Sequence, residues 1–137
     1  MQNSQKLIPP LSGKCHCGKI EFELMCHLKD LKRCNCSHCR RKGFVMTTVK
    51  LDEFKLISGK KDLMVYKWNT KIAKHYFCKH CGINTHHQRR SKPNEYGVNI
   101  GCLEGFKMEW IENVKCTEGV KFSLEDKTKI DASIYEK

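Results

Sequence analysis

The sequence has no long hydrophobic run, and this absence argues against a membrane protein and against a secreted one. Within the 137 residues no apolar stretch approaches the length of a membrane span, and residues 1–11 hold no apolar run of signal-peptide length. We therefore expect a cytoplasmic protein with reduced thiols and no membrane partner. Heptads, internal repeats, glycine-rich phosphate loops and a Ser-His-Asp arrangement are also missing, so the sequence does not indicate a coiled coil, a repeat protein, a nucleotide-binding loop or a serine hydrolase.

Proline is scarce as well, and two of the 3 prolines are adjacent at Pro9-Pro10. We expect residues 1–12 to form an extended lead-in and residues 13–137 to form a single domain. At this size a bound metal adds useful stability to a small core. The net charge of +11 attracts nucleic acids, anionic membranes and acidic small molecules alike, so charge by itself selects no partner.

Cysteine, in contrast, is abundant, with 10 residues. Most of the cysteines gather in three short clusters with the spacings Cys-x-Cys, Cys-x-Cys-x-x-Cys and Cys-x-x-Cys. These spacings suit ligands of one ion better than cross-links between distant strands. The sequence therefore predicts metal sites, with zinc as the metal, instead of a disulfide framework.

The middle cluster is Cys34-Asn-Cys36-Ser-His-Cys39, followed by Arg40 and Arg41. If residues 34–36 are extended, the first two thiols point to one face, and a turn at residues 37–42 brings the third beside them. Three protein ligands leave the fourth position of zinc open to water or substrate, as in catalytic sites. A fourth Cys or His would instead make the site structural, and the local spacing leaves both interpretations open.

The outer clusters each end in glycine, which permits the left-handed turn of a zinc knuckle. They are Cys15-His-Cys17-Gly18 and Cys78-Lys-His-Cys81-Gly82. With the middle cluster they supply seven cysteines, which divide into four plus three ligands. Spacing does not say which of the pairs share an ion.

Short alternating and β-rich segments predict a mainly β protein. Residues 19–24 alternate strictly, with Ile20, Phe22 and Leu24 on one face. Further strands are expected at residues 44–49, 54–57, 63–68, 72–77 and 96–103 and around residues 86–90. The strands at 54–57, 63–68 and 72–77 suggest an antiparallel meander. Residues 106–111 fit either a strand or one helical turn.

The three clusters and their flanking residues resemble the glutathione-dependent formaldehyde-activating enzyme family, which also contains centromere protein V. The resemblance runs through Gly-Lys-Cys15-His-Cys17-Gly, Cys34-Asn-Cys36-Ser-His-Cys39-Arg-Arg, His75-Tyr-Phe-Cys78-Lys-His-Cys81-Gly and Val98-Asn-Ile-Gly-Cys102-Leu. It implies an Mss4-like fold of short antiparallel strands. It also implies two Zn²⁺ per chain: a structural one bound by Cys15, Cys17, Cys78 and Cys81, and a catalytic one bound by Cys34, Cys36 and Cys39.

The same resemblance implies a carbon-sulfur lyase that binds a thiol, such as glutathione, at the open zinc and adds it to a small aldehyde such as formaldehyde. Arg40 and Arg41 either pair with substrate carboxylates or form a solvated cationic turn, and the sequence leaves both interpretations open. We expect His86 or His87 to transfer the proton. Adjacent strand residues face opposite ways, so at most one of the two histidines is expected at the site.

Two other hypotheses come from different classes. A zinc-stabilised basic module would bind nucleic acid or an acidic partner without catalysis, and its binding would weaken steeply with salt. An enzyme like the methionine sulfoxide reductases would use Cys102 as its nucleophile, but that family expects two Cys-x-x-Cys pairs and this chain has one.

Overall fold

A computed structural model describes residues 7–117 of the chain. The expected lead-in and domain therefore extend at both ends beyond the described residues, and the first strand begins at Leu11. The elements in chain order are β1 (Leu11–Lys14), β2 (Glu21–Leu24), β3 (Lys32–Cys34), α1 (Ser37–Lys42), β4 (Met46–Lys50), η2 (Leu51–Glu53), β5 (Phe54–Ser58), η3 (Lys60–Asp62), β6 (Leu63–Tyr66), β7 (Lys74–Cys78), β8 (Asn84–Gln88), β9 (Glu95–Asn99), η4 (Ile100–Cys102), η5 (Met108–Ile111) and β10 (Lys115–Thr117).

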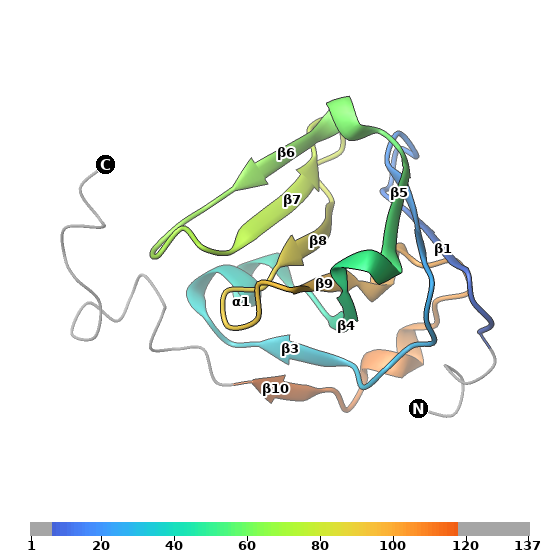
Figure 1. Ribbon diagram of the computed structural model, residues 1–137. Helices are drawn as coiled ribbons and strands as arrows, with labels where there is room; N and C mark the ends of the chain where they lie inside the picture. The colour runs from blue at the N-terminus through green and yellow to red at the C-terminus, as the bar shows by residue number, and fades with distance from the viewer. Residues whose placement is uncertain (1–6, 118–137) are drawn as a thin grey trace.

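The strands form two sheets, which confirms the expected mainly β fold of short antiparallel strands. The smaller sheet has the order β1-β2-β5, and the larger has the order β10-β3-β4-β9-β8-β7-β6. Each pair is antiparallel except β10 and β3, which are parallel. In Figure 1, β10 and β6 lie at opposite edges of the larger sheet, and β1 and β5 lie to one side of it.

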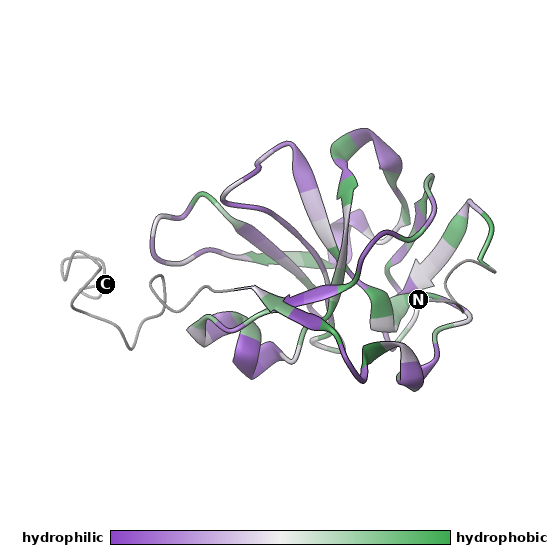
Figure 2. Cartoon of the chain, turned by 90° about the horizontal axis from the view of Figure 1, so that it is seen from below, coloured by the Kyte–Doolittle hydropathy of each residue, from purple (hydrophilic) through white to green (hydrophobic). Residues whose placement is uncertain are grey.

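The core fills the space between the small sheet and one face of the large sheet. Phe22 of β2 stacks on Phe54 of β5 at 5.1 Å between ring centroids, and Phe54 in turn packs on His86 of β8 at 4.2 Å. Hydrophobic and hydrophilic residues alternate over short stretches along the chain (Figure 2), as expected when strands bury one face. The buried core residues are Leu11, Phe22, Leu24, Leu31, Val45, Val49, Val98, Ile100, Cys102, Leu103 and Trp110.

The chain passes from the small sheet to the large one at Gly59. This residue has φ 95°, and a Cβ there would lie 2.3 Å from the carbonyl oxygen of Lys19, so only glycine allows the close approach. Strand β5 therefore pairs with β2 and does not join β6 and β7, in contrast to the expected meander of the segments at 54–57, 63–68 and 72–77. Strands β6 to β9 do follow one another as antiparallel neighbours.

Other local expectations have clear outcomes. The helical turn expected at residues 37–42 is α1, and residues 106–111 contain the 3-10 turn η5. The sequence does not predict strand β10, because its three residues, two exposed and one partly buried, are too few to carry a periodic signal. None of the helices within residues 7–117 has the length and apolar character needed to cross a membrane.

Candidate functional site

Two tight turns bring the outer cysteine clusters together. The first turn joins β1 to β2 and the second joins β7 to β8, and each uses a glycine in the left-handed region, Gly18 at φ 81° and Gly82 at φ 76°. The Gly82 N–H donates to the carbonyl of Cys78 at 2.8 Å, and the Gly18 N–H donates to Cys15 at 3.2 Å. Both turns thus present their thiols on the inside of a closed loop, as zinc knuckles do.

The sulfur atoms of this four-cysteine site, Cys15, Cys17, Cys78 and Cys81, all lie within 4.8 Å of one another. The Sγ atom of Cys17 is 3.6 Å from that of Cys15 and 3.6 Å from that of Cys78. Zinc with four sulfurs at about 2.3 Å requires sulfur-sulfur separations of about 3.8 Å, so the cluster fits a tetrahedral ion. The pairing implied by the resemblance is thus the one that the fold assembles.

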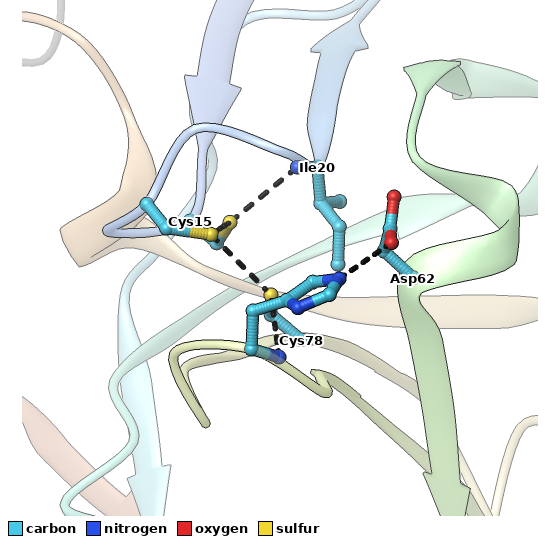
Figure 3. A network of polar contacts seen from close by, with 6 residues as sticks. Cys15, Ile20, Asp62 and Cys78 are labelled. Carbon is cyan, nitrogen blue, oxygen red and sulfur yellow. Dashed lines mark hydrogen bonds and ion pairs between the residues drawn. The ribbon is translucent and has the colours of Figure 1, made fainter.

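Neighbouring groups stabilise this site from outside (Figure 3). The Ile20 N–H donates to Sγ of Cys15 at 3.4 Å, and the His80 N–H donates to Sγ of Cys78 at 3.4 Å. The His80 ring also contacts the Asp62 carboxylate at 2.6 Å, which joins the second knuckle to η3. N–H donors favour charged thiolates, the form in which cysteine binds a metal.

The three-cysteine site is built by the passage from β3 into α1. Cys34 ends the strand, Cys36 is the N-cap of the helix with φ −64° and ψ 164°, and Cys39 lies in its first turn. The Cys39 N–H donates to Sγ of Cys36 at 3.3 Å, and the Cys36 N–H donates to Sγ of Cys34 at 3.4 Å. The three sulfurs lie within 4.8 Å of one another, and within residues 7–117 the site groups three ligand residues and no fourth.

A cavity of about 230 Å³ opens beside this site. It lies on the face of the large sheet opposite the core, because residues directly paired across β6, β7, β8 and β9 point to the same side. All three cysteines contribute to its wall. The other lining residues are Met46, Trp68, Asn69, Thr70, Ala73, His75, His87, Arg89, Arg90, Ser91 and Thr117.

Gly97 of β9 forms the floor under two of these side chains. A Cβ at this position would lie 2.3 Å from Cε1 of His87 and 2.7 Å from Sδ of Met46. The His87 ring and the Met46 side chain therefore lie directly against the backbone of β9, where any other residue would displace them.

Three histidines lie beside the three-cysteine site. His75 stands between the other two, with ring centroids 4.3 Å from His38 and 5.3 Å from His87. Burial and then the charge of Lys42 lower the pKa of His75 to about 2, and Lys42 Nζ lies 3.4 Å from its Nδ1. Burial also lowers the pKa of His38 to about 4 and that of His87 well below its usual value. The rings are thus neutral near pH 7.

His86 and His87 occupy opposite faces of β8, as expected for adjacent strand residues. His87 lines the cavity, whereas His86 lies in the core, with its ring stacked 4.6 Å from Tyr76 and its Nδ1 2.9 Å from the Thr85 hydroxyl. Burial lowers the pKa of His86 to about 3. Of the two histidines considered for proton transfer, the structure places His87 at the site.

The two arginines considered for binding substrate carboxylates lie outside the cavity. Arg40 and Arg41 are exposed on α1, where Arg41 Nη1 donates to the carbonyl of Ser37 at 2.8 Å, and neither lines the cavity. Arg89 and Arg90 do line it. A signal existed for Arg89, because on one strand it falls on the same face as His87.

Cys102 lies away from the cavity, buried in the core. Its Sγ donates to the carbonyl of Asn84 at 3.8 Å, and burial raises its pKa to about 12. A thiol in this state is a poor nucleophile. The hypothesis of a reductase with Cys102 as nucleophile therefore gains no support.

Comparison with known proteins agrees with this geometry. A family model described as glutathione-dependent formaldehyde-activating enzyme matches residues 10–118. A crystal structure of a protein from Rhodobacter sphaeroides is 44% identical and superimposes with a TM-score of 0.73, covering 77% of this chain and 99% of that one.

Proposed function

Because the chain belongs to the glutathione-dependent formaldehyde-activating enzyme family, we propose that it binds a small thiol beside Cys34, Cys36 and Cys39 and adds it to a small aldehyde such as formaldehyde. In this addition a carbon-sulfur bond forms, the carbonyl π bond breaks, and the thiol proton ends on the oxygen to give an S-hydroxymethyl thiol. The observation that carries the proposal is the opening of a three-sulfur site into a cavity of about 230 Å³.

The three cysteines suit zinc with one exchangeable position. Zinc bound by Cys34, Cys36 and Cys39 would accept a thiol as its fourth ligand and lower the pKa of that thiol. Cys36 and Cys39 are buried, and the sulfur of Cys36 accepts a hydrogen bond from the Cys39 N–H. The four-cysteine site has no such exchangeable position and serves the fold.

We assign to His87 the role of hydrogen-bond donor to the aldehyde oxygen. Its Nδ1 is buried without a hydrogen-bond partner and packs with Cε1 against Gly97. A buried N–H donor without an acceptor is costly, so the ring proton belongs on Nε2, the nitrogen left to face the cavity. From there the neutral His87 ring would donate a hydrogen bond to the aldehyde oxygen and stabilise the negative charge that develops on it as the C–S bond forms. The proton released by the thiol then ends on that oxygen.

The remaining walls limit the access of water to the aldehyde. Met46, Trp68 and Ala73 give the cavity apolar surface next to the cysteines. Formaldehyde adds water readily, so an apolar wall favours attack by sulfur over hydration. The buried Nε1 of Trp68, which has no partner among the described residues, offers one further donor at this wall.

Cobalt substitution tests the proposal directly. The protein is loaded with Co²⁺, the thiolate charge-transfer band is followed as glutathione or cysteine is added, and adduct formation with formaldehyde is measured by exchange NMR. We expect the band to change on thiol addition and exchange to exceed the uncatalysed background. His87→Phe should retain the band change and lose most of the acceleration, by about 10²–10³-fold for a lost hydrogen-bond donor to a developing oxyanion.

Cys116→Ser is the matched control, because this thiol is exposed and lies outside both clusters. It should behave like the wild type, whereas Cys36→Ser should abolish the band change. An unchanged band with every thiol and background exchange rates would reject the proposal. The alternative of a basic binding module would then be examined by the salt dependence of nucleic-acid binding.

A further inference from the structure

Two lysines lie side by side on β3 and β10, the strands that carry the cavity-lining residues Cys34 and Thr117. Strands β3 and β10 are parallel, with Lys32 opposite Lys115 and Cys34 opposite Thr117. Because Cys34 and Thr117 line the cavity and side chains alternate along a strand, the two lysines, two positions earlier, lie on the same face. Like charges directly opposite each other destabilise a sheet, so this pair needs a compensating partner.

The pairing of β3 with β4 supports this placement, and further cations lie near Lys32. Met46 of β4, which lines the cavity, lies opposite Lys32 and so points to the same side. Arg89, Lys92 and Lys115 all repel the Lys32 ammonium, whereas Glu95 attracts it.

Glu95 compensates this cluster only in part. Its carboxylate is already bound by Arg89, with Nη1 and Oε1 2.6 Å apart. The four cations thus outnumber the carboxylate among them. Lys32 and Arg89 are half-buried, Lys92 and Lys115 are exposed, and Arg89 lines the cavity. A surface with this excess of positive charge beside a cavity is complementary to an anion.

We propose that Lys32 and Lys115, together with Arg89, form a binding site for an oxyanion, a phosphate or carboxylate group. The group would belong to a ligand whose other end reaches the three-cysteine site. Its identity as the anionic end of the thiol substrate rests on the proposed function, but the anion site itself does not.

The strand geometry sets the length of such a ligand. Lys32 and Cys34 are two residues apart on one strand, which separates their Cα atoms by about 7 Å. If the anion lies about as far from the thiol sulfur as these two Cα atoms lie from each other, a chain of roughly five bonds joins the two groups. Thiols as short as mercaptoacetate would reach one site and not both.

The first measurement needs no thiol and no catalysis. Inorganic phosphate is titrated into the metal-loaded full chain, and backbone amide resonances are followed by NMR. We expect saturable shifts at Lys32, Lys115 and Arg89 that weaken as salt is raised. Shifts confined to other lysines, or no saturation, would overturn the anion site.

The second measurement compares thiols of equal length in the cobalt-loaded protein: 5-mercaptopentanoate, 4-mercaptobutylphosphonate and the neutral 5-mercaptopentanol. We expect the anionic thiols to bind about tenfold more tightly than the alcohol, as charge-assisted hydrogen bonds provide. Carboxylate and phosphonate differ in charge, so their ranking identifies the preferred oxyanion. The Lys32→Gln/Lys115→Gln variant should lose this advantage and bind the alcohol unchanged.

Lys55→Gln is the control, because Lys55 is an exposed lysine on β5 in the other sheet. It should keep the full advantage of the anionic thiols.

Lys32→Gln and Lys115→Gln should also not lower thermal stability without anion, since each removes a repulsion; a loss of stability would indicate a structural role. If phosphate binds and no thiol does, the proposed function fails while the anion site stands. If the neutral alcohol binds as tightly as the anionic thiols, the anion site is contradicted and the proposed function is not.

Discussion

At the scale of single residues, Gly97 shapes the cavity by having no side chain. The His87 ring and Met46 rest on its backbone, so the position of the proposed hydrogen-bond donor depends on a residue that takes no part in the chemistry. The sequence shows this glycine only as an interruption in an alternating strand, and its reason becomes clear from the neighbours on β4 and β8.

We predict that Gly97→Ala will lower the free energy of unfolding by about 1–3 kcal/mol, the usual cost of overpacking a close contact. The new methyl group must move His87 and Met46, so thiol affinity should fall as well. Gly101→Ala, where a Cβ would lie 3.2 Å from Oδ1 of Asn99, is the milder control. Urea unfolding measures the change in stability, and the cobalt band measures thiol affinity. An unchanged affinity in Gly97→Ala would show that His87 and Met46 can move aside without disturbing the thiol site.

His86 gives a pH-dependent prediction. Its pKa is about 3 in the folded chain and about 6.5 when unfolded, so between these values the unfolded state binds the proton and the native state does not. The free energy of unfolding should therefore decrease as pH falls from about 6.5 towards 3, and it should be unaffected by this group above that range.

The measurement is urea unfolding at several pH values for the wild type and His86→Phe. The variant loses the hydrogen bond to Thr85 and is expected to be less stable at pH 7.5, but its stability should fall less between pH 6.5 and 4. Other groups titrate equally in both proteins, so the difference isolates His86. Parallel curves would contradict the prediction.

At the scale of elements, the two cysteine sites differ in what they connect. The four-cysteine site joins the β1–β2 turn to the β7–β8 turn, which belong to different sheets. The three-cysteine site lies within one strand-to-helix passage and connects no distant elements. Loss of metal from the two sites should therefore have different consequences.

We predict that Cys78→Ser will prevent stable folding, whereas Cys36→Ser will leave a folded chain with less metal. A structural zinc contributes on the order of 10 kcal/mol, which is comparable to the entire stability of a small domain. Serine at position 36 can still serve as the N-cap of α1. Far-UV circular dichroism and thermal melts decide this, with Cys116→Ser as control, and equal destabilisation of both variants would make the middle cluster structural.

The sequence predicted most elements and all seven clustered cysteines, because alternation and ligand spacing are local signals. The helical turn at residues 37–42 and the strand with Phe22 and Leu24 follow from such patterns. The partner of β5 and the existence of β10 do not, since both depend on pairing between distant segments. The resemblance itself is confirmed by the family match over residues 10–118.

The cavity was the least predictable feature. His75, His87 and Trp68 come from different strands and a hairpin loop, and only the register of β6, β7 and β8 brings them to one face. Arg40 and Arg41 follow the cysteines in sequence, but the helix points them to solvent. The position of the two arginines next to the cysteines in the sequence therefore did not predict their position relative to the cavity.

At the scale of the whole molecule, we predict about two zinc ions per chain, one for each cysteine site. A chelator should remove one ion rapidly and the second slowly, because the three-cysteine site offers three protein ligands instead of four and adjoins a cavity. Elemental analysis during chelation, with circular dichroism in parallel, should show the first loss without unfolding. Simultaneous loss of both ions with the fold would contradict the division into two kinds of site.

The four-cysteine site also sets an order of events while the chain is synthesised. Its Cys17 and Cys78 are 61 positions apart, so their sulfurs can meet only after the ribosome has released the second knuckle. The three-cysteine site is complete by residue 39, roughly forty residues earlier, an interval of a few seconds at typical rates of translation. During those seconds the three-cysteine site already has its full set of ligands, whereas the four-cysteine site has only Cys15 and Cys17. We therefore expect the first ion that the nascent chain acquires to bind at the three-cysteine site.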